Sequence, residues 1–460
     1  MKLWLDVDDL FFFAERSARP TGIQRLTGEV YKALHSLAGD AIGFVRHDSQ
    51  GGFAIVGWAE VAETYDALVG ERLPPPTAVG EASPSKERPS WLNRLGLALG
   101  LRSARPPSAD FQTASSPLTL REFAKPGDML CALGAPWHDP LYTERVGRCK
   151  AESGVRFSVL IHDLIPLIRP EFFEKGRAPH FEAVIGGILP LTDLVLTNSR
   201  ATAADVTKWS SERGISLKAA PVPLPIGSGF SSRRLAGTLP FPLKEREFVL
   251  FVSTIEVRKN HTQAFRIWCA LLRDLPEGIV PTLVFAGSWG WMVEDLRKAI
   301  EATNYLNGKL QIILSPDDAT LAALYEGCRF SLYLSHYEGW GLPVSDSLSY
   351  GKPCVASNRA SIPEAGGRFC VYVDPDNTTG ATEVVRSLLT DPSLLARLEG
   401  DLKTGFIPTS WTETARFLLD LVSPNCPVST SSSSGLFNSR SAGNESLTRE
   451  RPGGHLQKLS

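Results

Sequence analysis

The sequence predicts an α/β fold with two domains, each built on a parallel sheet covered by crossover helices. Two observations support this fold class. Short runs rich in β-branched and aromatic residues alternate with longer helical patterns through most of the chain. Residues 224–245, rich in Gly, Pro and Ser, separate two such halves and form a natural linker. The 460 residues are enough for two or three domains with large buried cores.

Each half contains apolar runs of strand length. In the first half we expect strands at residues 3–7, 42–45, 129–133, 157–161 and 194–197. In the second half we expect them at residues 248–253, 282–286, 311–314, 330–335, 353–356 and 371–373. An amphipathic helix is predicted at residues 24–37, after the first strand.

Two segments depart from this alternation. Residues 72–116 are dense in Pro, Ser and Ala and are interpreted as an insertion. Within them, the apolar stretch 90–102 carries Arg94 and Arg102, and it fits either a short helix on an anionic membrane surface or a lid packed on the protein. The serine-rich tail at residues 423–460 is expected to be disordered.

Composition narrows the class of protein. The net charge is −2 and the sequence has no basic stripe, which argues against nucleic-acid binding. The seven cysteines are scattered without close-paired metal spacing, so we expect core cysteines in a reducing compartment. Acidic residues come too early for a secretory signal peptide, and no apolar run reaches the roughly 18 residues of a spanning helix. The expectation is a cytoplasmic protein, with contact at a membrane surface left open.

The most informative feature is a pair of acids, Glu338 and Asp346, on either side of a glycine-rich turn that runs into a predicted helix. Free N–H groups and the positive end of the helix dipole favour anions at such a turn, and carboxylates accept hydrogen bonds from hydroxyls. A ligand with both phosphates and hydroxyls, a sugar nucleotide, fits this combination. The alternative is that each acid is only a cap or a partner of the dipole.

A second strand-to-helix segment, residues 251–261, carries Arg258 and Lys259, which can neutralise a pyrophosphate. Gly287 also follows a predicted strand, at a sheet edge where a nucleotide can lie. These two segments and the acid pair place the predicted sugar-nucleotide site in the second half of the chain.

Three residues in the first half are candidates for the same binding site. His162 follows the predicted strand at residues 157–161, at the end of the strand where ligands of α/β sheets gather, although a structural histidine is the alternative. Gly22 allows close approach of a phosphate or substrate, although a plain turn also explains a glycine. Trp137 can shape an acceptor pocket or pack in the core.

Two acidic segments keep alternative interpretations. Asp6, Asp8 and Asp9 resemble a triplet that could hold a divalent cation against a diphosphate, while surface capping acids are the other interpretation. Glu364, in a short predicted helix with a glycine stop, can bind a ligand or support the first turn of its own helix.

Taken in order, these motifs resemble the retaining glycosyltransferase family 4, whose GT-B fold has two Rossmann-like domains facing across a cleft. The resemblance is strongest over residues 247–422, clear over 157–199, and reduced to 21–25 in the first third. A subgroup of bacterial polysaccharide mannosyltransferase-like enzymes reads Thr-Ile-Glu-Pro-Arg-Lys-Asn-His, here with Val257 in place of the proline.

The resemblance implies a division into domains. Residues 1–230 would form the acceptor domain and residues 246–405 the domain for the nucleotide-sugar donor. Residues 408–422 would form a helix that crosses back to the first domain.

The resemblance also implies a role for each motif residue. Lys259, with Arg258, would hold the donor pyrophosphate, and His162 would lie beside the transferred sugar. Glu338 would face the donor hexose, and Asp346 would bind the ribose hydroxyls. The turn that would meet the phosphates or the sugar consists of Gly339, Trp340, Gly341, Leu342 and Pro343. Two positions depart from many relatives: Thr254 stands in place of an arginine, and Asp346 is one methylene shorter than the usual glutamate.

The implied reaction is retaining transfer of a hexose, mannose from GDP-mannose, to a glycan or polyprenyl-diphosphate-linked acceptor in surface polysaccharide biosynthesis. No cofactor and no metal would be required, and the enzyme could contact the inner membrane surface. The alternatives are a UDP-glucose or other UDP-sugar donor, a metal-dependent transferase using Asp6 and Asp8, and a non-catalytic scaffold that binds sugar nucleotides.

Overall fold

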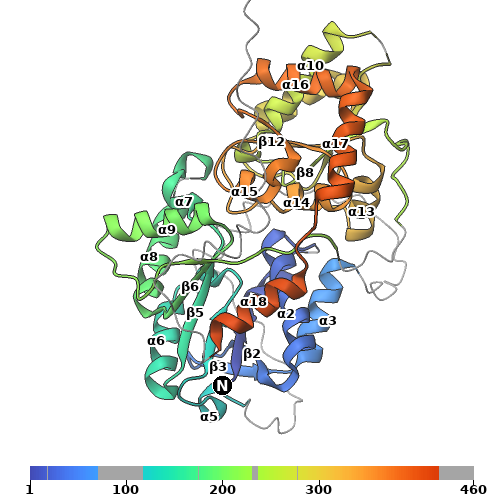
Figure 1. The fold of residues 1–460 in the computed structure, drawn as a ribbon. Helices are drawn as coiled ribbons and strands as arrows, with labels where there is room; N and C mark the ends of the chain where they lie inside the picture. The colour runs from blue at the N-terminus through green and yellow to red at the C-terminus, as the bar shows by residue number, and fades with distance from the viewer. Residues whose placement is uncertain (18, 71–117, 175, 231–236, 277, 424–460) are drawn as a thin grey trace, which may run out of the picture. The chain divides into compact units, whose positions relative to one another are not determined.

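The computed structural model describes residues 1–17, 19–70, 118–174, 176–230, 237–276 and 278–423. The predicted insertion at residues 72–116, with its apolar stretch 90–102, lies outside the described residues. So does the tail beyond residue 423. All described residues belong to one unit, Met1–Pro424, that contains two sheets (Figure 1).

The first sheet has seven strands in the order β3-β2-β1-β4-β5-β6-β7. All neighbours are parallel except β2 and β3, which form an antiparallel pair. The strands are β1 (Leu3–Asp6), β2 (Ile42–His47), β3 (Phe53–Val56), β4 (Met129–Ala132), β5 (Arg156–Ile161), β6 (Leu194–Thr197) and β7 (Val222–Pro223). In register, Asp6 at the end of β1 lies beside Val45 and Ala132, so the ends of three strands meet at one edge.

The second sheet has six parallel strands in the order β10-β9-β8-β11-β12-β13. They are β8 (Phe248–Val252), β9 (Thr282–Ala286), β10 (Leu310–Ile313), β11 (Ser331–Tyr333), β12 (Cys354–Ser357) and β13 (Cys370–Val373). Their continuous apolar sequences are typical of parallel strands that helices cover on both faces.

Helices connect the strands. In the first half they are α1 (Asp8–Ala14), α2 (Gly22–Ala38), α3 (Trp58–Val69), α5 (Leu120–Phe123), α6 (Tyr142–Ser153), α7 (Ile165–Ile168), α8 (Arg177–Ile188) and α9 (Arg200–Glu212). In the second half they are α10 (His261–Asp274), α11 (Glu294–Ala302), α12 (Asn304–Asn307), α13 (Asp318–Gly327), α14 (Leu342–Ser349), α15 (Ile362–Gly366), α16 (Thr378–Thr390), α17 (Pro392–Gly405) and α18 (Trp411–Val422). The 3-10 turns are η1 (Gly39–Ala41), η2 (Pro136–His138), η3 (Pro170–Phe172), η4 (Leu189–Leu191), η5 (Val257–Lys259) and η6 (Gly367–Phe369).

Alternate residues of each strand enter different cores, as the period of two requires. In β1, Leu3 and Leu5 belong to the core under α2 and α3, whereas Trp4 belongs to the core under α6 and α8. Helix α18 packs against α2 of the first half and buries Trp411 and Leu418 there (Figure 1).

The expected α/β fold is confirmed, and each predicted strand coincides with an observed one to within two residues at either end. The prediction omitted β3, a short edge strand formed by a hairpin with β2, and β7, which has two residues. Four of the six described cysteines, Cys131, Cys149, Cys328 and Cys354, are buried as expected of core residues, whereas Cys269 and Cys370 are partly exposed. Among the described residues, no helix has the length and apolar character needed to cross a membrane.

Candidate functional site

Two strand-to-helix connections in the second half build the candidate site. After β8 the chain turns through Glu256, whose side chain accepts from the Arg258 amide, and then enters α10. After β11 it passes Glu338 and reaches α14, which begins at Leu342 with Pro343 in its first turn, as expected. Gly341 has a φ of 119°, a backbone region that favours glycine.

These connections line a cavity of about 650 Å³ together with residues of the first half. Nearly all of the predicted site residues line it: Gly22, His162, Arg258, Lys259, Gly287, Glu338, Gly339, Trp340, Gly341, Leu342, Pro343 and Asp346. Trp137 does not; its ring packs edge-on against the His162 ring and against Phe181. Its neighbourhood is therefore the aromatic packing that was the alternative interpretation.

Glu338 is the centre of a buried ionic cluster. Its Oε2 lies 2.7 Å from Nη1 of Arg258, and its Oε1 accepts from Nζ of Lys259 at 2.6 Å. The Tyr333 hydroxyl also donates to Oε1, at 2.9 Å. Arg258 reaches Glu256 as well, at 2.9 Å. The predicted phosphate-binding cations and the predicted sugar-facing acid therefore lie at one point of the cavity.

The charges of this cluster follow from its surroundings. Burial would raise the pKa of Glu338, but Arg258 and Lys259 together lower it to about 2, so the carboxylate is ionised at neutral pH. Burial and the adjacent Arg258 lower the pKa of Lys259, while Glu338 acts in the opposite direction. A buried cluster of this kind is characteristic of functional sites, although structural ion pairs can also produce it.

His162 lies at the end of β5, as predicted, and is buried. Its Nε2 is 2.8 Å from the Leu133 carbonyl oxygen, which can only accept, so Nε2 carries the hydrogen. Its Nδ1 then accepts from the Asn198 amide at 3.2 Å. Burial lowers the pKa of His162 to about 4, so the ring is neutral at pH 7 and both nitrogens are engaged by the protein.

Asp346 connects α14 to the segment after β7, because its Oδ1 accepts from the Gly229 amide at 2.8 Å. Near it, Arg25 of α2 forms two 2.6 Å hydrogen bonds to Asp318 of α13. The Arg25 guanidinium also lies over the Phe230 ring, 4.3 Å from its centroid. Asp318 thus pairs with the first-half segment 21–25, and no feature of its local sequence indicates this partner.

Glu364 has a partner that neither earlier interpretation included. Its two oxygens accept from the amides of Arg200 and Ala201 at 2.9 and 2.8 Å. It therefore caps the N-terminus of α9, where an anion is favoured by the unpaired N–H groups and the dipole.

The interpretation of Asp6, Asp8 and Asp9 as surface capping acids holds only in part. Asp6 and Asp9 are buried rather than on the surface, but Oδ1 of Asp6 accepts from the Asp8 amide at the start of α1, at 3.1 Å. Asp6 and Asp8 both contact His47, and they also contact Tyr142 and His138, respectively. Asp9 accepts from Gln24 instead.

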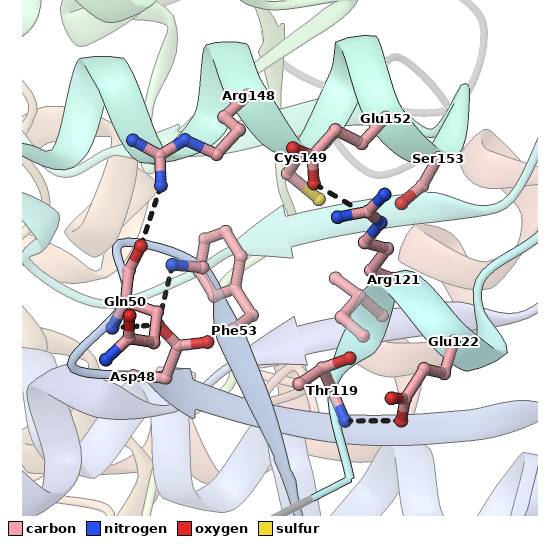
Figure 2. A pocket seen from close by; sticks show the side chains of 12 residues that line it. Asp48, Gln50, Phe53, Thr119, Arg121, Glu122, Arg148, Cys149, Glu152 and Ser153 are labelled. Carbon is pink, nitrogen blue, oxygen red and sulfur yellow. Dashed lines mark hydrogen bonds and ion pairs between the residues drawn. The ribbon is translucent and has the colours of Figure 1, made fainter.

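A second cavity, of about 460 Å³, lies between the β2–β3 hairpin, α5 and α6 (Figure 2). Arg148 donates to the Gln50 carbonyl at 2.7 Å, and Arg121 pairs with Glu152 at 3.8 Å. None of the predicted site residues lines this cavity, so it provides no support for the predicted chemistry.

Several residues of the main cavity were not proposed from the sequence, among them Asn198, Tyr333 and Glu256. Asn198 follows β6 as His162 follows β5, so the rule that ligands gather at strand ends would have identified it. Tyr333 is the last residue of β11, so the same rule would have identified it.

Comparison with known proteins finds one family match and several related sequences. Residues 240–401 match the family described as Glycosyl transferases group 1. The chain is 26% identical over 239 residues to the O-antigen chain mannosyltransferase B of Escherichia coli, covering 50% of this chain and 61% of that protein. It is also 26% identical over 223 residues to the Escherichia coli serotype-specific mannosyltransferase WbdA, covering 45% of this chain and 26% of that protein.

Solved structures show the same fold at low identity. The crystal structure of Anabaena Alr3699/HepE in complex with UDP superposes with a TM-score of 0.56 and 13% identity, over 92% of this chain and 99% of that one. Sucrose-phosphate synthase from Thermosynechococcus elongatus gives a TM-score of 0.55 and 14% identity, over 92% and 98%. The two sheets therefore have the GT-B fold, and the matched residues form a glycosyltransferase group 1 domain.

Proposed function

We propose that the chain is a retaining glycosyltransferase that moves mannose from GDP-mannose to a glycan or polyprenyl-diphosphate-linked acceptor in surface polysaccharide biosynthesis. The observation that carries the proposal is the cavity that brings Glu338, Arg258 and Lys259 together. The group 1 match and the mannosyltransferase names of two relatives support the reaction class and the sugar. The acceptor class and a position on the cytoplasmic face of the membrane belong to the same proposal.

Arg258 and Lys259 would stabilise the leaving diphosphate. Negative charge grows on the phosphate oxygens as the bond to the sugar breaks, and fixed cations in a closed site stabilise that charge. In the described structure both cations pair with Glu338. Donor binding would therefore exchange part of this pairing for pairing with the pyrophosphate, and no metal is required for that exchange.

Glu338 is ionised and therefore accepts hydrogen bonds from sugar hydroxyls and favours positive charge on the reacting carbon. His162 would act through position rather than proton transfer, because its ring is neutral and both nitrogens are bonded. Transfer with retention would occur on the face that the diphosphate leaves, and a phosphate oxygen would take the acceptor proton.

Two further polar atoms suit a ligand rich in hydroxyls. Asn198 Oδ1 and the indole Nε1 of Trp340 are buried without a hydrogen-bond partner among the described residues, and both residues line the cavity. An unpaired buried polar atom costs free energy, so an acceptor and a donor left open here are explained by a bound hydroxylated ligand. Asp346 would bind the ribose of the nucleotide.

The donor site is tested by thermal shift with GDP, UDP, GDP-mannose and UDP-glucose. We expect GDP-mannose to raise the melting temperature most, because a ligand that binds only the folded state stabilises it. A larger shift with the UDP compounds would replace the donor in the proposal. If no nucleotide shifts the melting temperature at millimolar concentration, the donor-site assignment fails.

Turnover is tested separately, with Glu338→Gln. The variant should lower kcat for mannose release or transfer by about 100-fold or more, the order expected for one lost electrostatic contact at the reacting centre. Glu383→Gln, at an exposed position of α16, is the matched control and should leave kcat unchanged. Donor binding without turnover on a broad acceptor panel would favour the scaffold alternative instead.

A further inference from the structure

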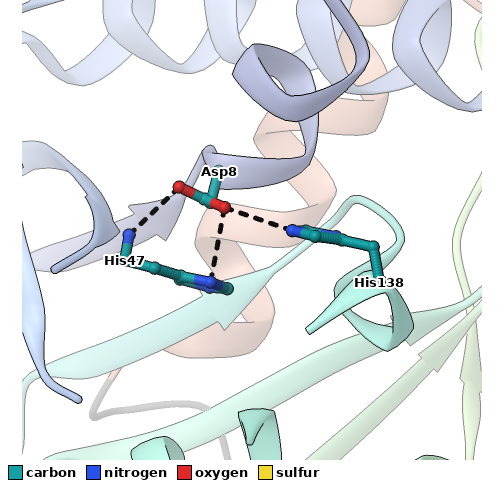
Figure 3. A group of neighbouring side chains, drawn as sticks. All are labelled: Asp8, His47 and His138. Carbon is teal, nitrogen blue, oxygen red and sulfur yellow. Dashed lines mark hydrogen bonds and ion pairs between the residues drawn. The ribbon is translucent and has the colours of Figure 1, made fainter. Parts of the chain in front are cut away.

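A group of ionisable side chains outside the cavity lies at the edge of the first sheet where β1, β2 and β4 end. Asp8 opens α1 just after β1, His47 ends β2, and His138 lies in η2 after β4. Figure 3 shows both imidazole rings turned toward the same carboxylate. The side chains are only 14%, 9% and 12% exposed, respectively.

The three side chains converge on one atom. Nδ1 of His47 lies 3.3 Å from Oδ2 of Asp8, and Nε2 of His138 lies 3.1 Å from the same oxygen. All three atoms lie within 4.8 Å of one another. Ligand atoms around a tetrahedral zinc ion, bonded at about 2.0–2.1 Å, are about 3.3 Å apart, so two of the three spacings match such a site.

The neighbours of each ring orient its lone pair toward this point. Nδ1 of His138 lies 2.9 Å from the Ala135 carbonyl oxygen and must donate to it, which leaves Nε2 unprotonated in the neutral ring. Nε2 of His47 lies 3.2 Å from Oδ2 of Asp6, so in the neutral ring Nδ1 is the unprotonated nitrogen. In the neutral rings two lone pairs and a carboxylate oxygen then face one another, and either a proton on the rings or a metal cation between them removes the repulsion.

The supporting residues are arranged as around known metal sites. Asp6 receives a hydrogen bond from Tyr142 at 2.8 Å as well as from His47, which gives a carboxylate–histidine pair behind the ligand. The other oxygen of Asp8 accepts from the His47 amide at 3.2 Å, which turns Oδ2 toward the rings. Phe12 stacks on His138 with centroids 4.3 Å apart and fixes the ring plane.

We propose that Asp8, His47 and His138 bind one divalent transition-metal ion of the zinc class. Two imidazoles with a carboxylate favour such an ion over Mg²⁺ and Ca²⁺, which prefer oxygen ligands. Asp139 lies beside the ligands: its Oδ2 is 3.1 Å from Nδ1 of His47 and is also paired with Nε of Arg145 at 3.1 Å. The site lies outside the donor cavity and its role does not depend on the proposed function.

The ion would tie together three strand ends that are distant in sequence. It would also fix the start of α1, because its ligand Asp8 is the first residue of that helix. The next residue, Asp9, accepts from Gln24 at 2.9 Å. Gln24 in turn closes the capping box with Thr21, a residue that lines the donor cavity. We therefore assign the ion a structural role at the edge of the first sheet where β1, β2 and β4 end, one connection away from the cavity wall.

The test is metal analysis of the full chain, purified without a histidine tag. We expect about one zinc ion per chain, and removal by chelator should lower the melting temperature until zinc is restored. His138→Gln should abolish the response to zinc. His35→Gln, a histidine of α2 outside the cluster, should keep it.

If His138→Gln does not fold, the variant Asp6→Asn provides the test. This variant keeps all three ligands and should weaken zinc affinity by about 10–100-fold, the effect of losing the carboxylate behind a ligating histidine. The proposal is overturned if the wild-type chain is purified without metal and zinc does not raise its melting temperature, or if Asp6→Asn binds zinc as tightly as the wild type. Failure of the sugar-nucleotide tests would leave all of these measurements unaffected.

Discussion

At the scale of single residues, Gly339 is required by a close approach between the turn before α14 and the end of β5. A Cβ at this position would overlap the carbonyl oxygen of His162 and lie 3.1 Å from the Cβ of Asp163. A backbone carbonyl cannot rotate away as a side chain can, so the turn itself would have to move. Gly339→Ala should lower the free energy of unfolding by about 1–3 kcal/mol and weaken donor binding.

Urea denaturation and thermal shift with the donor check this prediction. Gly400→Ala is the matched control, because Gly400 lies in α17 with open space around it. Replacing this helical glycine should raise stability by about 0.5–1 kcal/mol. A Gly339→Ala protein as stable as the wild type, with unchanged donor affinity, would show that the close approach does not exist in solution.

The sequence predicted where the site residues lie better than which residues they contact. Glu338, Arg258 and Lys259 were assigned to one site because each follows a strand, a property that the local sequence contains. Their direct ion pairs join Glu338 to residues 80 and 79 positions earlier in the chain, and spacing along the chain carries no information on such a contact. The same holds for Asp8, whose histidine partners could be found only in three dimensions.

At the scale of elements, a buried ion pair joins α2 to α13. Arg25 and Asp318 have side chains only 9% and 6% exposed and form two hydrogen bonds. Asp318→Asn would leave the guanidinium buried without its carboxylate, so we expect a loss of about 3–5 kcal/mol in the free energy of unfolding. Urea denaturation measures this loss.

A double variant tests the reason for that loss. Arg25→Met combined with Asp318→Leu removes both charges and should recover most of the stability. Glu247→Gln breaks an exposed pair with Lys244, both side chains being more than 60% exposed, and should change stability by less than about 0.5 kcal/mol. An Asp318→Asn protein no less stable than this control would contradict the prediction.

Strands were predictable where an apolar run of the sequence had the length of a buried strand. The buried parallel strands have continuous apolar sequences, and each was expected close to its observed position. β3 was missed because it is an edge strand that pairs only with β2, through a hairpin whose turn is stabilised by Asp48. Its sequence alone does not distinguish it from an apolar stretch of loop.

At the scale of the whole molecule, the response to acid depends on two buried histidines in different halves. Burial lowers the pKa of His162 to about 4 and of His261 to about 3. In the unfolded chain both rings would titrate near 6.5. Between these values the unfolded chain binds more protons than the folded one, so this contribution to stability is complete above pH 6.5 and is lost as the pH falls.

His261→Phe isolates one of these contributions. His261 stacks on Phe251 with centroids 4.2 Å apart and meets Phe285 edge-on, so an aromatic ring without a titrating nitrogen can replace it. Between pH 6.5 and 4.5 the variant should lose about 2–3 kcal/mol less of its free energy of unfolding than the wild type. The buried carboxyls of Asp163 and Glu256, whose pKa burial raises, act in the opposite direction but are common to both proteins and cancel in the difference.

Urea denaturation at the two pH values measures this difference in stability loss. His180→Gln, at an exposed position, is the control. Equal losses in wild type and His261→Phe would show that His261 titrates normally in the folded protein.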